Sequence, residues 1–268
     1  MKNEALELTW PAEDVALITL TRGAEMNTLT HAFLDSMEAA LAGLRGTAVR
    51  ALIITGSGRA FCCGAHLDYF TEDQLGRDAG FVLRDTYLDR IARVFDSLEE
   101  QPYPVIAAIN GFALGGGGEL ALSCDFRLMA KTARIGLPEV KLGAIAGAGG
   151  VQKLIRHVGR SKALEWILLG THVTAEEAER RGLVYAVTEP EALLPQALAL
   201  AERLKGLSPR AIAQSKSAIY LSEDADLRSA RRFGLEALSL LIGSADWTEG
   251  IAAFHDKRPP RFRRGHQN

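Results

Sequence analysis

The sequence predicts an α/β protein whose first part alternates strands and helices and whose last part is almost entirely helical. Three observations support this fold class. Short β-branched apolar runs end in glycine turns, the intervening segments carry apolar residues at spacings of three and four, and this helical spacing dominates from Ser161 onward. The 268 residues, 47% of them hydrophobic and 24% charged, suit a globular chain with a large core and exclude disordered, collagen-like and disulfide-scaffold classes.

The first strands and the first helix follow from local pattern. Apolar, β-branched runs at 15–21 and 49–55 are closed by glycine turns, as buried strands of α/β proteins are. Between them a helix is expected over 31–44, because Thr30 is a good N-cap residue and Gly46 a stop signal.

A polar, acidic loop at 68–78 is expected to lead into a helix over 81–98. Further strands are expected at 105–109, 126–130 and 135–140, the last interrupted by Pro138. A second glycine cluster, at 143–150, opens a helix over 151–157. The remaining helices are expected at 161–169, 174–181, 191–205, 208–221, 225–242 and 246–255. The basic tail at 257–267 is interpreted as a solvated segment.

Composition and missing motifs exclude several functions. Lys and Arg total 31 against 33 Asp and Glu, so nucleic acid is disfavoured as the main partner. Three cysteines without a CxxC pair, and six histidines without ligand spacing, predict neither a disulfide framework nor a metal site. GxGxxG, Walker, GxSxG and HExxH motifs are absent from the sequence, which removes the simplest support for nicotinamide, nucleotide-hydrolysis, serine-hydrolase and zincin chemistry.

The start of the chain and its longest uncharged run bear on location. The first ten residues, MKNEALELTW, carry acids where a signal peptide would be apolar. The uncharged run at 101–118 contains two prolines and five glycines, so we expect a buried strand and loop and no membrane association. Reduced thiols and the lack of an export signal predict a cytoplasmic protein.

Residues 110–125, NGFALGGGGELALSCD, place four consecutive glycines directly before a short apolar helix. Glycines let a ligand approach the backbone, and a helix N-terminus offers unpaired N–H groups, so the pattern indicates an anion or oxyanion site. The same run is also typical of a tight turn at a close packing contact. Glu119 favours the functional interpretation, because an acid at the edge of so apolar a segment is costly to bury without a purpose.

Two further features complete the candidate site. Glu139 lies 20 residues later beside another glycine cluster; alone it would be an ordinary exposed acid. Two carboxyl groups in apolar surroundings acquire unequal pKa values, which suits one acid and one base at neutral pH. After the second strand, RAFCCGAHL at 59–67 contains a Gly64-Ala65 turn that could offer another outward N–H, and two N–H groups on one carbonyl oxygen would stabilise an enolate.

These segments resemble the crotonase (enoyl-CoA hydratase/isomerase) superfamily. FCCGAHL is similar to its F-C-A-G-A-D-L, residues 110–125 to its N-G-x-A-x-G-G-G-x-E-L-x-x-x-C-D, and GLPEVKLGAIAGAGGVQKL to its P-E-x-x-L-G-x-x-P-G-x-G-G-x-Q-x-L. The likeness includes 26–29 and 249–262, so it spans almost the whole chain in the same order.

The resemblance implies a spiral of β-β-α turns over 1–200 and a C-terminal helical trimerisation region over 201–268, usually in a homohexamer of two trimers. It implies an acyl-CoA substrate, with no cofactor besides the CoA of that substrate. Ala65 and Gly116 would supply the two oxyanion-hole N–H groups. Glu119 would activate water for attack at C3, and Glu139 would deliver a proton to C2. The substrate-binding residues would be Ala65, His66, Leu67, Asp68 and Gly116, with Phe254 and Lys257 reaching the CoA of a neighbouring subunit.

Two residues depart from the family pattern. His66 replaces the usual Asp, which would alter CoA contacts or acyl preference, and Ala146 replaces the usual Pro, which would loosen the loop that holds Glu139. Because both glutamates are kept, we expect an enoyl-CoA hydratase that acts on a trans-2-enoyl-CoA. The alternatives are an enoyl-CoA isomerase or another crotonase-type reaction and, more distantly, an RNA-binding or scaffold protein. The loop at 68–85, expected to shape the acyl pocket, has no pattern that reveals the acyl chain.

Overall fold

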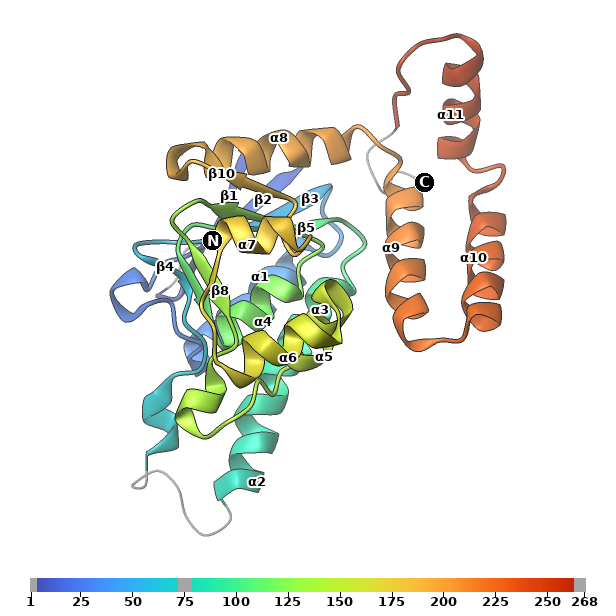
Figure 1. The fold of residues 1–268 in the computed structure, drawn as a ribbon. Helices are drawn as coiled ribbons and strands as arrows, with labels where there is room; N and C mark the ends of the chain where they lie inside the picture. Colours follow the sequence, from blue (N-terminus) through green and yellow to red (C-terminus); the bar gives the residue numbers. More distant parts are fainter. Residues whose placement is uncertain (1–3, 72–78, 263–268) are drawn as a thin grey trace.

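The computed structural model describes residues 4–71 and 79–262 of the chain. Parts of the expected loop at 68–78 and of the basic tail therefore lie outside the described residues. Two sheets form the centre, and helices surround them, with the last three helices standing beside the core (Figure 1).

The larger sheet has six strands in the order β1-β2-β3-β5-β7-β10. Their bounds are β1 Leu6–Ala12, β2 Val15–Leu20, β3 Ala51–Gly56, β5 Val105–Ile109, β7 Phe126–Ala130 and β10 Ala186–Thr188. β1 and β2 pair antiparallel, and every other pair is parallel. All five residues of β5 are buried, as its unbroken apolar run predicts for a strand covered on both faces.

The smaller sheet has the order β4-β6-β8-β9, with β4 at Ala60–Cys62, β6 at Phe112–Leu114, β8 at Arg134–Gly136 and β9 at Val173–Thr174. Its first three strands are parallel. Each of them follows a strand of the larger sheet and leads into helical structure, so three successive β-β-α turns stack along the chain. The expected α/β spiral is thereby confirmed.

The helices lie close to their expected positions. Their bounds are α1 His31–Leu44, α2 Ala79–Leu83, α3 Asp89–Glu99, α4 Gly116–Leu122, α5 Gly150–Val158, α6 Arg160–Leu168, α7 Ala175–Arg180, α8 Leu193–Lys205, α9 Pro209–Asp224, α10 Leu227–Leu241 and α11 Ala245–His255. Short 3-10 turns occupy η1 Gly23–Glu25, η2 Leu67–Phe70, η5 Glu139–Leu142 and η6 Pro190–Ala192, and a π-helical turn, η4, occupies Arg84–Leu88. Thr30 caps α1 as predicted, its hydroxyl accepting a hydrogen bond from the amide of Phe33.

The bounds of one expected strand are wrong. The strand expected at 135–140 ends at Gly136, and the 3-10 turn η5 follows it. The part after Ser161 also contains β9 and β10, and β10 joins the larger sheet beside β7. Strands of two or three residues are too short to show an alternating pattern, and tertiary pairing alone specifies them.

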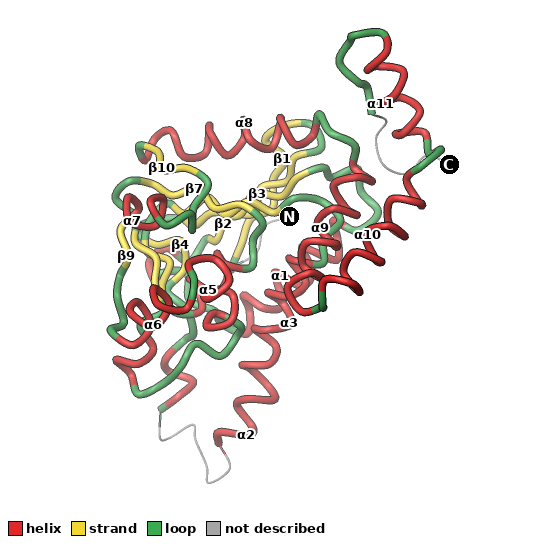
Figure 2. Tube along the Cα trace, turned by 45° about the vertical axis from the view of Figure 1, so that its right-hand side comes forward, coloured by secondary structure: helices red, strands yellow, loops and turns green. Residues whose placement is uncertain are grey.

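The last three helices attach to the core mainly through α9 (Figure 2). The Lys216 ammonium is buried and donates to the Asp125 carboxylate at 2.8 Å and to the Leu98 carbonyl at 2.9 Å. The Tyr220 hydroxyl donates to the other Asp125 oxygen at 2.9 Å. Beyond these contacts, α10 exposes large apolar side chains at Leu227, Leu235, Leu238 and Leu240. Trimerisation through this region stays a prediction, as does the division at residue 200.

Within the described part of the chain, the helices lack the combination of length and apolar character that a membrane crossing requires.

Candidate active site

The glycine run at the start of α4 serves packing and leaves backbone donors free. A Cβ at Gly117 would lie 1.8 Å from the Cys62 carbonyl oxygen, and one at Gly118 would lie 2.8 Å from that of Gly136, so α4 packs directly on β4 and β8. Gly115 has φ +58°, a left-handed conformation that favours glycine. Gly117 and Gly118 therefore serve close packing, whereas the N–H of Gly116, at the start of the helix, stays available to a ligand.

The two predicted oxyanion donors lie side by side. A Cβ at Gly64 would be 2.7 Å from the Gly116 amide nitrogen, and a Cβ at Gly116 would be 3.7 Å from the Ala65 nitrogen. Gly116 opens α4, so its N–H has no partner within the helix. Across residues 4–71 and 79–262, neither the Ala65 nor the Gly116 N–H donates to a protein acceptor. Both are therefore available to one carbonyl oxygen.

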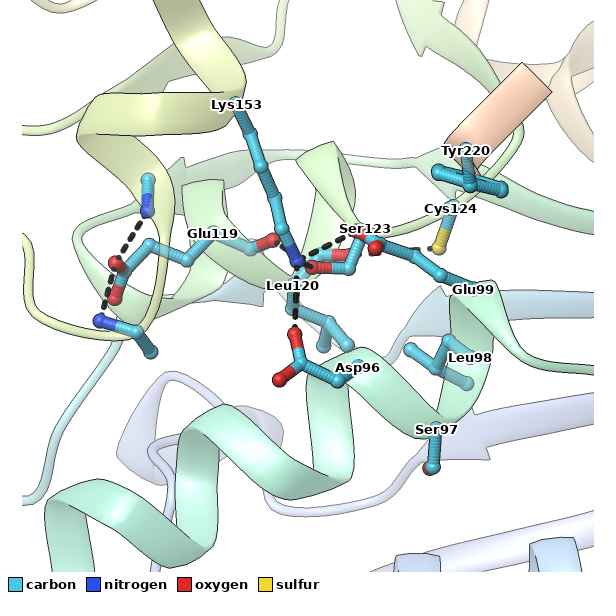
Figure 3. A network of polar contacts seen from close by, with 12 residues as sticks. Asp96, Ser97, Leu98, Glu99, Glu119, Leu120, Ser123, Cys124, Lys153 and Tyr220 are labelled. Atoms are coloured by element: carbon cyan, nitrogen blue, oxygen red, sulfur yellow. Dashed lines mark hydrogen bonds and ion pairs between the residues drawn. The ribbon is translucent and has the colours of Figure 1, made fainter. Parts of the chain in front are cut away.

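Glu119 is 4% exposed and lies in the first turn of α4. Its Oε1 accepts hydrogen bonds from the amides of Ala148, at 2.8 Å, and Gly150, at 2.9 Å (Figure 3). Burial raises the pKa of Glu119, while the two amides and the Lys153 ammonium oppose that rise. Two N–H donors favour the ionised form of this carboxyl.

Glu139 opens η5 and has a different environment. Burial raises its pKa to about 7, and the negative charge of Glu119 adds to the rise. Among the described residues its Oε2 is buried without a hydrogen-bond partner. A Cβ at Gly115 would lie 3.3 Å from Glu139 Oε1, which places this carboxyl beside the start of α4. The two acids are thus close enough to interact, and their surroundings differ: two amides donate to Glu119, whereas Glu139 Oε2 has no partner among the described residues. Their roles as base and acid stay a prediction.

A network of polar contacts connects the backbone of Glu119 to the neighbouring helices (Figure 3). The Lys153 ammonium on α5 donates to Ser123 Oγ at 2.7 Å and pairs with Glu99 Oε1 of α3 at 2.6 Å. Ser123 Oγ in turn donates to the Glu119 carbonyl at 2.9 Å. These contacts tie α3, α4 and α5 together behind the carboxyl that the α5 N-terminus holds.

The predicted substrate-binding residues divide into two groups. His66 lies next to Ala65, with Nδ1 3.2 Å from Thr28 Oγ1 and Nε2 3.4 Å from Asp68 Oδ2. Leu67 is 57% exposed, and Asp68 is also exposed.

Phe254 and Lys257 form the second group. Phe254 is 79% exposed on α11, and Lys257 follows that helix. Figure 1 shows α4 in the middle of the core and α11 well away from it, so within one chain this pair does not join the other predicted residues. Their contact with the CoA of a neighbouring subunit stays a prediction.

Sequence reasoning missed the groups that hold the site in place. The amides of Ala148 and Gly150 bind Glu119. The glycine cluster directly before the helix predicted over 151–157 was the signal that could have indicated them. Ala146, which replaces the usual Pro, is buried. Its effect on the loop stays a prediction.

Known proteins resemble this chain in sequence and in fold. A family model described as enoyl-CoA hydratase/isomerase matches residues 11–265. The chain belongs to this family. It is 39% identical over 250 residues to a 2,3-dehydroadipyl-CoA hydratase of Escherichia coli, covering 93% of this chain and 95% of the relative. It is 37% identical over 254 residues to a crotonyl-CoA hydratase of Syntrophomonas wolfei, with 93% and 95% covered.

A solved structure of an enoyl-CoA hydratase from Bacillus anthracis superposes with a TM-score of 0.90 at 35% identity, covering 98% of this chain and 100% of that one. The crotonase-type enzyme thus has the fold that its sequence predicts. Within its described ranges, His, Cys, Asp and Glu form no group of three or more placed to hold a metal ion.

Proposed function

We propose that this enzyme is an enoyl-CoA hydratase, which adds water across the C2–C3 double bond of a trans-2-enoyl-CoA to give a 3-hydroxyacyl-CoA. One observation carries the proposal: two carboxyl groups of unlike environment lie beside a pair of free backbone N–H groups. Hydration needs a base for water and an acid for carbon, and the pair offers both. The names of the two hydratase relatives point in the same direction.

The proposed reaction balances without a resident cofactor. The thioester oxygen accepts hydrogen bonds from the Ala65 and Gly116 amides. Glu119, ionised, takes a proton from water as the water oxygen bonds to C3, and the electron pair of the double bond moves onto the thioester as an enolate. Glu139, protonated, then gives its proton to C2. Exchange of protons with solvent returns both carboxyls to their starting states.

Isomerisation is the second candidate, and the isolation of Glu139 favours it. One of its oxygens is buried and has no partner in the described part of the chain, and its pKa is about 7. Both properties suit a single group that removes a proton from one carbon and returns it to another. In that reaction Glu119 would have only an indirect role.

The test compares Glu119→Gln, Glu139→Gln and the double variant by kcat on crotonyl-CoA. Each single change is expected to lower hydration by about 10² to 10⁴, because each removes one general acid or base. The losses should fall short of additive, since both groups act in one transition state. Glu165→Gln, which changes an exposed acid on α6, is the matched control and should keep its rate. Retention of hydration within about threefold by Glu119→Gln, with loss in Glu139→Gln, would replace the proposal with isomerisation.

The assembly is proposed to be a homotrimer or homohexamer in which Phe254 and Lys257 complete the CoA site of a neighbour. The exposed apolar side chains of α10 support an interface in this region. Sedimentation of the purified protein, and KM for crotonyl-CoA with Lys257→Met, test this part. A monomer, or an unchanged KM, would contradict it.

A further inference from the structure

A buried tyrosine links the two loops that surround the predicted oxyanion donors. Tyr87 is fully buried, and its hydroxyl accepts a hydrogen bond from the His66 amide at 3.0 Å. The same hydroxyl donates to the Leu29 carbonyl. Burial raises the pKa of this phenol, so it stays a donor throughout the working pH range.

Leu29 contacts both halves of the donor pair. Its amide donates to the Gly64 carbonyl at 2.8 Å, and it forms an isolated parallel bridge with Ala65. Its Cδ1 would lie only 2.7 Å from a Cβ at Gly116, so its side chain packs against that glycine. A group that fixes the Leu29 backbone therefore fixes the spacing between the two donors.

The local helix geometry brings Tyr87 to this place. Tyr87 belongs to the π-helical turn between α2 and α3, where the amide of Asp89 donates to the carbonyl of Arg84, five residues earlier. Such turns are rare and occur frequently at functional sites. The phenol ring is held independently of its hydroxyl by the rings of His31, Tyr69 and Phe70, whose centroids lie 5.3, 5.2 and 6.1 Å away.

We propose that Tyr87 is a positioning residue, whose hydroxyl holds the Ala65 and Gly116 N–H groups in place. The proposal rests on the oxyanion role given to these amides under the proposed function. The His66 N–H requires an acceptor, and the Leu29 C=O requires a donor. A hydroxyl group supplies both. Phenylalanine would leave the buried Leu29 carbonyl and the partly buried His66 amide without this partner, and the loops would shift to satisfy them.

The expected effect lies in catalysis more than in binding. Removing one oxyanion donor costs about 10² to 10³ in rate. In Tyr87→Phe both donors remain but lie out of position, so kcat should fall by about tenfold to a hundredfold. The CoA contacts are expected elsewhere along the substrate, so KM should change by less than about threefold.

The experiment compares Tyr87→Phe with Tyr103→Phe. Tyr103 is 6% exposed and, among the described residues, its hydroxyl has no hydrogen-bond partner, so the control deletes the same buried atom without deleting a contact. The readouts are kcat and KM with crotonyl-CoA and the infrared carbonyl stretch of bound butyryl-CoA labelled with ¹³C at C1. This saturated thioester takes up no water, and its stretch falls in frequency when its oxygen accepts hydrogen bonds.

In the wild type and in Tyr103→Phe, the carbonyl stretch should fall on binding, and in Tyr87→Phe it should fall less, together with kcat. Equal kcat and equal stretch in Tyr87→Phe and wild type would overturn the proposal. Equal losses in both variants, or a Tyr87→Phe chain that does not fold by circular dichroism, would also overturn it, because the hydroxyl would then serve the core as a whole.

The infrared readout separates this inference from the proposed function. A wild type that does not hydrate crotonyl-CoA, yet shows a carbonyl shift that Tyr87→Phe reduces, would refute the hydratase proposal and support the positioning role. A wild type that binds butyryl-CoA without any shift would refute the oxyanion assignment and the positioning role together.

Discussion

Glu139 has a pKa of about 7 because it is buried and because Glu119 carries a negative charge nearby. In the proposed reaction it must be protonated to deliver a proton to C2. Hydration should therefore fall as pH rises through about 7. The measurement is kcat/KM on crotonyl-CoA from pH 5.5 to 9 at constant ionic strength. A rate that is constant across this range would contradict the assignment of Glu139 as the acid.

The same shift makes a prediction about stability. Because the folded pKa of Glu139 lies above its unfolded value of 4.5, the native state holds its proton more tightly. The resulting stabilisation is complete below pH 4.5 and is lost as pH rises through about 7. Glutamine does not titrate, so the melting temperature of Glu139→Gln relative to wild type should rise between pH 4.5 and pH 8. Calorimetric scans at several pH values check this, and a constant difference would contradict it.

His66 offers a residue-scale test of the departure from the family pattern. Its ring lies between Thr28 and Asp68, while its backbone amide is held by Tyr87. His66→Asp should keep the fold and keep kcat within about threefold, because the backbone contact remains, and should shift KM. Steady-state kinetics on crotonyl-CoA decide this. A folded variant without turnover would show that the histidine takes part in the chemistry.

At the scale of single elements, the N-terminus of α5 is the most sensitive to added volume. A Cβ at Gly150 would lie 2.7 Å from Glu119 Cγ and 2.9 Å from its Oε1, so Gly150→Ala must displace that carboxyl. We expect kcat to fall at least tenfold, since small misplacements of a reacting group are costly. Gly147→Ala is the matched control, because nothing lies within 4 Å of a Cβ there. Equal rates in the two variants would show that the α5 N-terminus does not position Glu119.

The elements differ in how far sequence could predict them. The helix at His31–Leu44 and the strand at Val105–Ile109 were predicted with their bounds, because cap, period and apolar content agree locally. β4, β6 and β10 have three residues each, too few for a period, and only the partner strand specifies them. β1 was missed because half-exposed, acid-containing sequence lacks the apolar signal of a buried strand.

For the molecule as a whole, the attachment of α9 depends on a buried ion pair. Lys216→Met removes the partner of Asp125 and leaves that carboxylate largely buried beside Tyr220. Losing one member of a buried pair costs about 3 to 5 kcal/mol, whereas an exposed pair contributes about 0 to 1 kcal/mol. Lys131→Met, which breaks an exposed pair with Glu189, is the control. At one protein concentration, the urea midpoint of unfolding of Lys216→Met should lie below that of Lys131→Met. Equal midpoints would contradict a structural role for Lys216.

The candidate site illustrates the limit of sequence for the whole molecule. Ala65, Gly116, Glu119 and Glu139 were predicted from motif positions, and the structure brings them together. The supports at Tyr87, Ala148 and Lys153 were not predicted, because their roles arise from contacts between elements far apart in the chain. No local pattern of charge or period distinguishes such a residue from an ordinary core or surface position.

The stacking of the three β-β-α turns bears on how such an enzyme can change over evolutionary time. Gly117 and Gly118 are fixed by backbone atoms that any side chain would strike, so inheritance of the fold depends on them. The Glu119 carboxyl is held by the amides of Ala148 and Gly150, and Glu139 lies near enough to feel its charge, but neither acid belongs to a strand of the two sheets. A lineage can therefore replace either acid while its descendants keep the same turns. Selection for new reactions can therefore change the residues at 119 and 139, while the glycines at 117 and 118 must stay for the scaffold to fold.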